Sequence, residues 1–460
     1  MSFTSKHIAV IGMARTGLAV AEVMTDLEAR VTLWDTKPEA ELSDAIETAR
    51  KLGAEFRTGT NQVELDGVDL IVPSPGVPAG SPVLVEARRR GVEVIAEIEL
   101  AYRLAKAPIV AITGTNGKTT TTVLTGKIFE ADRRDTYIAG NVVAGDIRMP
   151  LVMAAHRAGP DSVIVAEIST FQLEWISSFR PKVAMLLNVT VDHMDRHASF
   201  EEYSSLKARI FANQTDEDFA VINSENPFTA SLRGKLAGRV LEFARCREIA
   251  EGGFLRGDEL IVRIGGIEKV ICARGDIPLR GEHNVENVLA AGCAAAAMGA
   301  GPRSILKAVR EFKPIEHRLE PVAVIDGVEY INNSMCTNVD AAVRSIEAID
   351  EPQIVIAGGR DKGGDYAALG RAFAGKAKHV VLIGEGAQLI EDAARGAGFG
   401  AVTRASSMAD AVEIARRKAE PGDVIVLTPC ASSFDMFASF EHRGQVFKEI
   451  VKGMEGNSEL

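Results

Sequence analysis

The sequence predicts an α/β protein of three tandem domains, and three observations support this prediction. The chain has 460 residues, enough for about three domains of roughly 150 residues each. Apolar runs alternate with stretches of helical periodicity along most of the chain. Most of these runs lack side-chain alternation, which is typical of parallel strands that helices cover on both faces. We expect a Rossmann-like domain over residues 1–100, a central P-loop-type ATPase domain with a mostly parallel sheet over 101–314, and a Rossmann-like domain over 315–460.

Composition excludes several classes of protein. Lys and Arg total 52 against 63 Asp and Glu, a net charge of -11, and no basic run is long enough to follow a phosphate backbone. We therefore expect no nucleic-acid partner. The N-terminus has no signal-peptide pattern and the apolar stretches are short, so we expect a cytoplasmic protein without a membrane span. We also expect a monomer, although the sequence does not determine the oligomeric state. The five cysteines lack CxxC spacing and indicate neither a zinc site nor a disulfide framework.

The first domain begins with a βαβ pattern. An apolar strand over 7–11 leads through a Gly-rich turn into a helix that runs to Ala29, and a strand over 31–34 follows. A further strand is expected over 69–72, then a Pro- and Gly-rich stretch and a strand over 92–95.

The turn Gly12–Gly17, followed by Asp35, looks like a dinucleotide fingerprint in which Ala14 replaces the middle glycine. Despite this replacement, the turn keeps a helix N-terminus that can face a diphosphate. Asp35 keeps a carboxylate that can accept a hydrogen bond from a ribose hydroxyl. The turn favours a nucleotide-like ligand, with a purely structural turn as the alternative.

The remaining elements continue the alternation. A helix over 97–104 precedes the central domain, an antiparallel excursion of short strands is expected within 240–273, and an Ala-rich helix over 284–298 closes the domain. The expected buried strands are 109–113, 162–167, 183–188 and 219–223 in the central domain, and 353–357, 379–383 and 423–427 in the last.

The strongest motif is a nucleotide-phosphate loop after the strand over 109–113. Its residues are Gly114, Thr115, Asn116, Gly117, Lys118, Thr119 and Thr120. Glycines let backbone N–H groups surround a phosphate, Lys118 can reach the β and γ oxygens, and the Thr119 hydroxyl can bind Mg²⁺. A strict Walker A motif would have glycine where this chain has Ile112, so the loop is a shorter variant. A Gly-rich turn with an exposed lysine is the alternative.

Two further residues are expected to join this loop. Glu167 ends one predicted strand, and His193 follows another. The carboxyl ends of strands in α/β sheets line the ligand crevice, so both side chains should meet the phosphate loop there. We expect them to bind Mg²⁺, whereas either residue alone would favour a structural role.

The motifs together resemble the ATP-dependent Mur ligases, in order and over essentially the whole chain. They are Gly114–Thr120, Glu167–Glu174, Asn188–Arg196, Gly281–Asn287, His317-Arg318 and Pro429–Gly444. The Ser74-Pro75-Gly76 loop, Phe171–Glu174 and Ser433–Phe437 most resemble the members that add glutamate. The resemblance implies a UDP-sugar domain, an ATPase domain and a C-terminal domain that brings the amino acid.

The resemblance also implies roles for individual residues. The UDP-sugar would be held by Arg15, Thr16, Asp35, Thr36, Ser74, Gly76 and Asn141. The phosphate loop would hold ATP together with Asn284, Asn287, Arg318 and Asn333. The metal ligands would be Thr119, Glu167, His193 and Lys207, the last as a carbamylated lysine, and Lys118, His193 and Lys207 would be catalytic. The incoming glutamate would contact Thr337, Lys362, Ser433 and Phe440.

The implied activity is the ATP-dependent addition of D-glutamate to UDP-N-acetylmuramoyl-L-alanine through an acyl phosphate, in peptidoglycan precursor synthesis. Family members commonly carry Asp-Ser-Lys where this chain has Asn333, Ser334 and Met335. L-glutamate or another amino acid therefore stays open as the substrate, and so does a nucleotide-binding regulator with weakened catalysis. A folate polyglutamate ligase is disfavoured by the first hundred residues, and a P-loop GTPase by the lack of NKxD and DxxG motifs.

Overall fold

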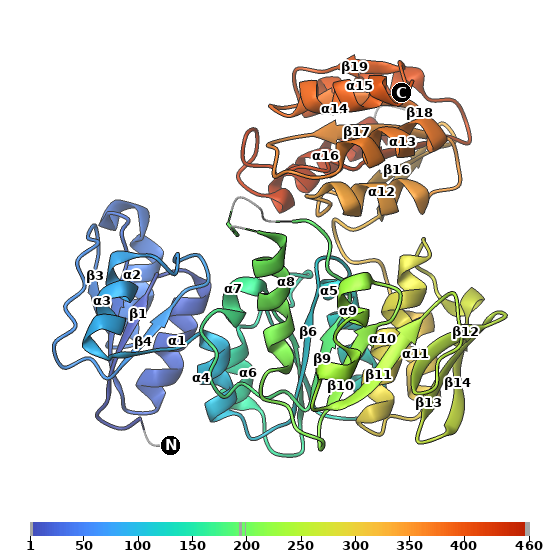
Figure 1. Ribbon diagram of the computed structural model, residues 1–460. Coiled ribbons are helices and arrows are strands. Elements are labelled where there is room, and N and C mark those ends of the chain that lie inside the picture. Colours follow the sequence, from blue (N-terminus) through green and yellow to red (C-terminus); the bar gives the residue numbers. More distant parts are fainter. Residues whose placement is uncertain (1–2, 193–195, 198, 456–460) are drawn as a thin grey trace. The chain divides into compact units, whose positions relative to one another are not determined.

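The computed structural model describes residues 3–192, 196–197 and 199–455 of the chain (Figure 1). The chain divides into two compact units. The first unit comprises Met1–Asn188, Tyr203–Ala273 and Val288–Val309. The second comprises Val189–Glu202, Arg274–Asn287 and Arg310–Leu460. The first unit holds two sheets and the second holds one, so the predicted three α/β sheets are confirmed. The boundaries after residues 100 and 314 stay predictions.

The N-terminal sheet is parallel throughout, with strand order β3-β2-β1-β4-β5. Its elements are β1 (His7–Ile11), α1 (Arg15–Asp26), β2 (Arg30–Trp34), α2 (Ser43–Lys51), β3 (Glu55–Arg57), β4 (Leu70–Pro73), α3 (Pro82–Arg90) and β5 (Glu93–Val94). The βαβ prediction is confirmed, and β1 has the predicted bounds. β3 was not predicted, because a strand of three residues is too short to form an apolar run.

The central sheet has nine strands in the order β14-β13-β12-β11-β10-β9-β6-β8-β7. They are β6 (Ile109–Thr113), β7 (Thr136–Gly140), β8 (Val163–Glu167), β9 (Val183–Leu186), β10 (Phe219–Asn223), β11 (Arg239–Ala244), β12 (Gly252–Arg256), β13 (Glu259–Ile264) and β14 (Ile267–Ala273). The predicted antiparallel excursion is only partly correct. The pairings of β10 with β11 and of β11 with β12 are parallel. The pairings of β12 with β13 and of β13 with β14 are antiparallel. β7 was not predicted.

The helices before, between and after the strands of the central sheet are as follows. They are α4 (Glu97–Leu104), α5 (Lys118–Ala131), α6 (Leu151–Arg157), α7 (Thr170–Leu173), α8 (Phe200–Ala208) with the 3-10 turn η2 (Arg209–Phe211), α9 (Pro227–Ala230), α10 (His283–Ala297) and α11 (Pro302–Glu311). Every residue of β6 and β8 is buried. This burial explains why their sequences are apolar at consecutive positions.

The C-terminal sheet has the order β15-β16-β20-β17-β18-β19. Its elements are β15 (Glu320–Ile325), β16 (Val328–Asn332), α12 (Val339–Glu347), β17 (Gln353–Gly358), α13 (Tyr366–Lys376), β18 (Ala377–Ile383), α14 (Ala387–Gly396), β19 (Val402–Arg404), α15 (Met408–Lys418), β20 (Val424–Leu427) and α16 (Phe440–Glu455). β15 pairs antiparallel with β16, and the other pairs are parallel. The β15–β16 hairpin was not predicted, although β15 contains the apolar run 322–325. β15 lies at the edge of its sheet, and Ile325 is the one residue of the strand that is buried.

Candidate active site

The phosphate loop forms the connection between β6 and α5, as predicted. Gly117 lies at the N-cap of α5 with φ +83, a left-handed conformation that glycine adopts without a steric penalty. The side chain of Lys118 turns back over the loop, and its Nζ donates to the carbonyls of Gly114 (3.0 Å) and Thr115 (2.8 Å). The loop therefore places a cation and a helix N-terminus at the same point, a combination that suits a phosphate group.

Asn188, just after β9, holds the loop in shape. Its Oδ1 accepts from the backbone N–H of Asn116 (2.8 Å), and its Nδ2 donates to the carbonyl of Asn116 (3.1 Å). Its own carbonyl accepts from the N–H of Thr115 at 3.0 Å. This role of Asn188 was not predicted from the sequence. The sequence does show that Asn188 follows a predicted strand near the phosphate loop, and that position could have indicated its contact with the loop.

Glu167, at the end of β8, meets the first turn of α5. Its Oε2 accepts from the Thr119 hydroxyl at 2.8 Å, and its Oε1 accepts from the Asn141 side chain at 2.9 Å. The Glu167 side chain is buried, at 3% exposure, and both of these partners are neutral. A buried carboxylate beside a hydroxyl, without a cationic partner in the described part of the chain, fits Mg²⁺, which prefers oxygen ligands. Glu167 and Thr119 therefore lie together, and their binding of Mg²⁺ stays a prediction.

Lys207, on α8, also reaches the loop. Its Nζ donates to the carbonyl of Gly114 at 2.9 Å and lies 4.6 Å from the ring centroid of Tyr203. Lys207 is 2% exposed, so it is not the solvated helix lysine that the sequence alone would favour. The Tyr203 hydroxyl in turn lies 3.2 Å from the hydroxyl of Thr115, a contact that the sequence analysis missed. His193, the remaining expected ligand, lies outside the described residues.

A second group of predicted residues surrounds the turn after β1. The Asp35 carboxylate accepts from the backbone N–H groups of Met13 (2.8 Å) and Lys37 (3.0 Å). The Ser74 hydroxyl donates to the carbonyl of Gly12 at 3.4 Å. Asp35 thus shapes the turn, and a ribose contact stays a prediction. Among the other residues predicted for the UDP-sugar, Arg15, Thr36, Gly76 and Asn141 are exposed and Thr16 is partly exposed.

The first unit contains a pocket that is lined both by residues next to Ser74 and by residues of α4, of α7 and of the turn after α7. It is lined by Pro73, Ser74, Pro75, Val77, Ala96, Glu97, Phe171, Gln172, Glu174 and Trp175. Glu97 is buried and accepts from the backbone N–H of Val152 at 2.7 Å. Burial raises the pKa of Glu97 to about 7, although hydrogen bonds from Val152, Leu151 and Gln172 oppose the rise. Glu97 was not predicted as a site residue, because a glutamate at a helix start is usually exposed.

The remaining predicted nucleotide residues lie in the second unit. Asn287 donates to Asn284 at 2.9 Å, and the Arg318 guanidinium lies 3.3 Å from the Met335 sulfur. Asn333 is 3% exposed, accepts from the N–H of Leu319 and donates to the Ser345 hydroxyl. Its carboxamide therefore bonds to the backbone just before β15 and to a side chain of α12, and a ribose contact stays a prediction.

The four predicted glutamate ligands also lie in the second unit. Ser433 is 2% exposed, whereas Thr337, Lys362 and Phe440 are partly exposed. The phosphate loop belongs to the first unit. Their joint contact with one set of substrates therefore stays a prediction.

None of the helices in the described ranges is both long and apolar enough to cross a membrane. The five cysteines all lie in the described ranges and form no disulfide there; Cys246 is exposed and the other four are buried. Burial raises the pKa of the Cys336 thiol to about 12 and that of Cys430 further, so neither is primed as a nucleophile.

Three family models match the chain in succession. They are the Mur ligase MurD-like N-terminal domain over residues 6–96, the Mur ligase middle domain over 112–295, and the Mur ligase, glutamate ligase domain over 317–431. Relatives named UDP-N-acetylmuramoylalanine--D-glutamate ligase are similar over nearly the whole length. That of Pelotomaculum thermopropionicum is 45% identical over 98% of this chain and 99% of its own, and that of Koribacter versatilis is 42% identical over 99% of each.

Solved structures show the same fold at low sequence identity. The UDP-N-acetylmuramate-alanine ligase MurC of Thermotoga maritima superposes with a TM-score of 0.63 at 19% identity, over 97% of this chain and 99% of its own. A pseudomurein peptide ligase type C of Methanothermus fervidus gives 0.62 at 18% identity, over 98% of this chain and 100% of its own. The three successive family matches and the full-length relatives establish that this chain belongs to the Mur ligase family.

Proposed function

We propose that this chain is an ATP-dependent ligase that joins D-glutamate to UDP-N-acetylmuramoyl-L-alanine in peptidoglycan precursor synthesis, in the cytoplasm and as a monomer. The relatives at 45% and 42% identity carry the name of this activity. One observation supports it most directly. Lys118, Thr119, Glu167 and Lys207 lie together around the phosphate loop, at the carboxyl ends of β6 and β8.

The reaction balances in two steps. In the first, the alanine carboxylate of the UDP-sugar attacks the γ-phosphorus of ATP, the bond to the β-phosphate oxygen breaks, and ADP leaves. In the second, the amine of glutamate attacks the carbonyl carbon of the acyl phosphate, loses a proton, and expels inorganic phosphate. Neither step needs a covalent bond to the enzyme, which agrees with the buried, unactivated thiols of Cys336 and Cys430.

The residues of the site would act mainly by position and charge. Lys118 would leave the loop carbonyls and contact the phosphate oxygens on which charge develops in the transition state. Asn188 would keep the loop open for the phosphates. Thr119 and Glu167 would hold Mg²⁺, which supplies positive charge to the phosphates when it is bound. Lys207, as the carbamate that the family resemblance implies, would add a further oxygen ligand.

An isotope experiment tests the acyl-phosphate route. UDP-N-acetylmuramoyl-L-alanine labelled with ¹⁸O in its alanine carboxylate is incubated with ATP, Mg²⁺ and D-glutamate, and the released phosphate is analysed by mass spectrometry. One ¹⁸O atom should move into each phosphate, because the amine displaces the oxygen that attacked phosphorus. Unlabelled phosphate, or phosphate released without the amino acid at the full rate, would contradict the route.

The departures at Asn333 and Met335 favour a second candidate, a ligase of this scaffold that prefers L-glutamate or another amino acid. Met335 occupies the position where family members commonly carry a lysine, so this segment has one cation fewer. The Met335 sulfur contacts the guanidinium of Arg318. A nucleotide-binding regulator is the remaining alternative, and it would release no phosphate that depends on both substrates.

A further inference from the structure

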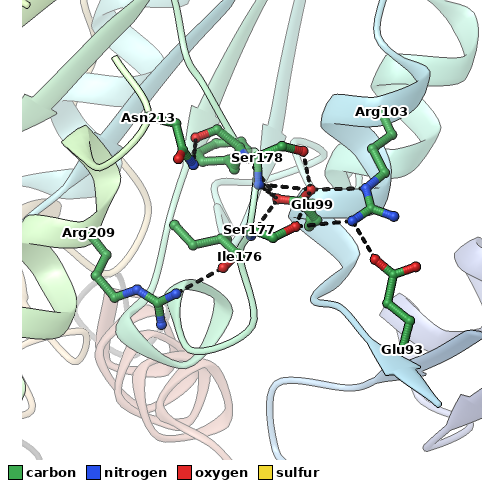
Figure 2. Close-up of polar contacts among 9 residues, drawn as sticks. Glu93, Glu99, Arg103, Ile176, Ser177, Ser178, Arg209 and Asn213 are labelled. Carbon is green, nitrogen blue, oxygen red and sulfur yellow. Dashed lines mark hydrogen bonds and ion pairs between the residues drawn. The ribbon is translucent and has the colours of Figure 1, made fainter. Parts of the chain in front are cut away.

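The segment Glu174–Pro181 runs from the end of α7 towards β9, and its peptide groups are held from two directions (Figure 2). On one side, the Glu99 carboxylate accepts from three consecutive backbone N–H groups. Ser177 donates at 3.0 Å, Ser178 at 3.0 Å and Phe179 at 2.8 Å. Glu99 is 0% exposed, so these bonds form away from water.

Arg103 supports this carboxylate. Its Nε donates to Glu99 at 3.0 Å, and its Nη2 donates to Glu93 of β5 at 2.8 Å and to the Ser177 hydroxyl at 3.1 Å. Burial alone would raise the pKa of Glu99, but the hydrogen bonds from Ser178, Ser177 and Arg103 outweigh it, so the pKa lies below its ordinary value. Glu99 is thus a charged anchor on α4.

On the other side, donors that follow α8 bind the carbonyl oxygens of the same segment. Arg209 donates to the carbonyls of Glu174 (2.7 Å) and Ile176 (2.9 Å), and Asn213 donates to that of Phe179 (3.1 Å). Gln214 adds a bond to the carbonyl of Pro181 at 3.1 Å. Figure 2 shows Arg209 and Asn213 pointing at the segment from the side opposite Arg103. The acceptors of all these bonds are backbone carbonyl oxygens, so the bonds fix the path of the backbone in this segment.

The position of Arg209 in the chain gives this contact a consequence for the active site. Arg209 is two residues beyond Lys207, whose Nζ contacts the Gly114 carbonyl of the phosphate loop. α8 ends between them, at Ala208. A shift of the end of α8 would therefore move Lys207 along the loop.

We propose that Arg209 is a positioning residue for the ligase reaction: by fixing the end of α8 to the segment that Glu99 anchors, it sets Lys207 against the phosphate loop. Because the guanidinium donates to two carbonyls at once, it fixes orientation as well as distance. The proposal rests on the proposed function for the part that Lys207 plays in catalysis. Its structural part, the placement of Lys207, can be measured without any activity.

The test compares three variants of the full chain. Arg209→Met removes both bonds, and Arg209→Lys keeps a cation with fewer donors. Arg180→Met is the matched control, because Arg180 lies in the same segment and its side chain donates hydrogen bonds to Asp218, Thr215 and Glu217 instead of to carbonyls of the segment. Brief acetylation with acetic anhydride, followed by peptide mass spectrometry, reports how accessible Lys207 is, with exposed Lys51 as the internal standard. Steady-state kinetics give kcat and KM separately.

We expect acetylation of Lys207 to rise at least about tenfold in Arg209→Met and less in Arg209→Lys, with no rise in Arg180→Met. The kcat of Arg209→Met should fall about tenfold to a hundredfold, while KM for the UDP-substrate changes less than about twofold. Lys207 that stays protected in folded Arg209→Met overturns the proposal, and so does an equal rise in Arg180→Met. If Arg209→Met does not fold, the same criteria apply to Arg209→Lys.

Failure of the proposed function has a different signature. A wild-type chain that makes no product would refute the ligase reaction, whereas the acetylation result would still decide whether Arg209 places Lys207. Normal product formation with unchanged kcat in Arg209→Met would refute the positioning role alone.

Discussion

Glu97 and Glu99 lie two residues apart on α4, and replacing each with glutamine should change stability with opposite dependence on pH. Burial raises the pKa of Glu97 from 4.5 to about 7 in the folded chain. Between these values the folded chain binds more protons than the unfolded chain, so stability falls as pH rises. Each pH unit of this difference is worth about 1.4 kcal/mol, so the full interval corresponds to about 3 kcal/mol.

Glu97→Gln removes that penalty, since a carboxamide cannot ionise but can still accept from Val152. The variant should match the wild type near pH 4 and should be more stable by up to about 3 kcal/mol at pH 8. Glu99→Gln should behave in the opposite way. The pKa of Glu99 is lowered, so its stabilising effect is present above about pH 4.5 and is lost as pH falls through the folded-state pKa.

Urea denaturation followed by circular dichroism, at half-unit steps from pH 4 to pH 8, measures both effects. The stability difference between Glu97→Gln and the wild type should grow between about pH 4.5 and pH 7. The deficit of Glu99→Gln should be constant at the upper end of the range and should shrink only as pH falls below about 4.5. A pH-independent difference for Glu97→Gln, or a loss of stability in that variant at pH 8, would refute the assignment of Glu97 as a buried group that resists ionisation.

Three further variants test the site. Lys118→Ala should lower kcat at least about a hundredfold without changing the melting temperature, and near-normal turnover in the folded variant would defeat the phosphate-loop assignment. Asp35→Ala should weaken binding of the UDP-substrate by about 1.5–3 kcal/mol in calorimetry, and an equal loss for ATP would argue against separate sites. Gly140→Ala should destabilise the chain by more than Gly53→Ala, because both glycines have positive φ but a Cβ at Gly140 would lie 2.3 Å from the Glu167 carbonyl, whereas Gly53 faces open space. Equal urea midpoints for the two glycine variants would contradict this.

Much of the fold could be predicted because buried parallel strands are apolar at every position. β6 and β10 have the predicted bounds for that reason, and α4 matches its predicted helix. Two of the missed strands lack a fully buried run of this kind. β3 has three residues, and β7 keeps its first three residues partly exposed. The parallel pairing of β11 and β12 was also missed, because Gly-rich turns are as compatible with it as with hairpins.

The candidate site was predictable where a local motif carries the chemistry, as in the loop from Gly114 to Thr120. Residues that act through long-range contacts were not. Glu99 accepts from residues about eighty positions further along the chain, and nothing near it in the sequence indicates those partners. Asp35 was predicted as a ligand residue, but its carboxylate bonds the turn itself, a contact that only the path of the backbone reveals.

Product analysis with a panel of amino acids tests the central claim most directly. The chain is incubated with UDP-N-acetylmuramoyl-L-alanine, ATP and Mg²⁺ together with D-glutamate, L-glutamate or another D- or L-amino acid, and the UDP-linked product and released phosphate are quantified by mass spectrometry and colorimetry. We predict one D-glutamyl product and one phosphate for each ATP consumed, with little product from L-glutamate. A clear preference for another amino acid, or no phosphate release that depends on both the UDP-substrate and the amino acid, would contradict the account.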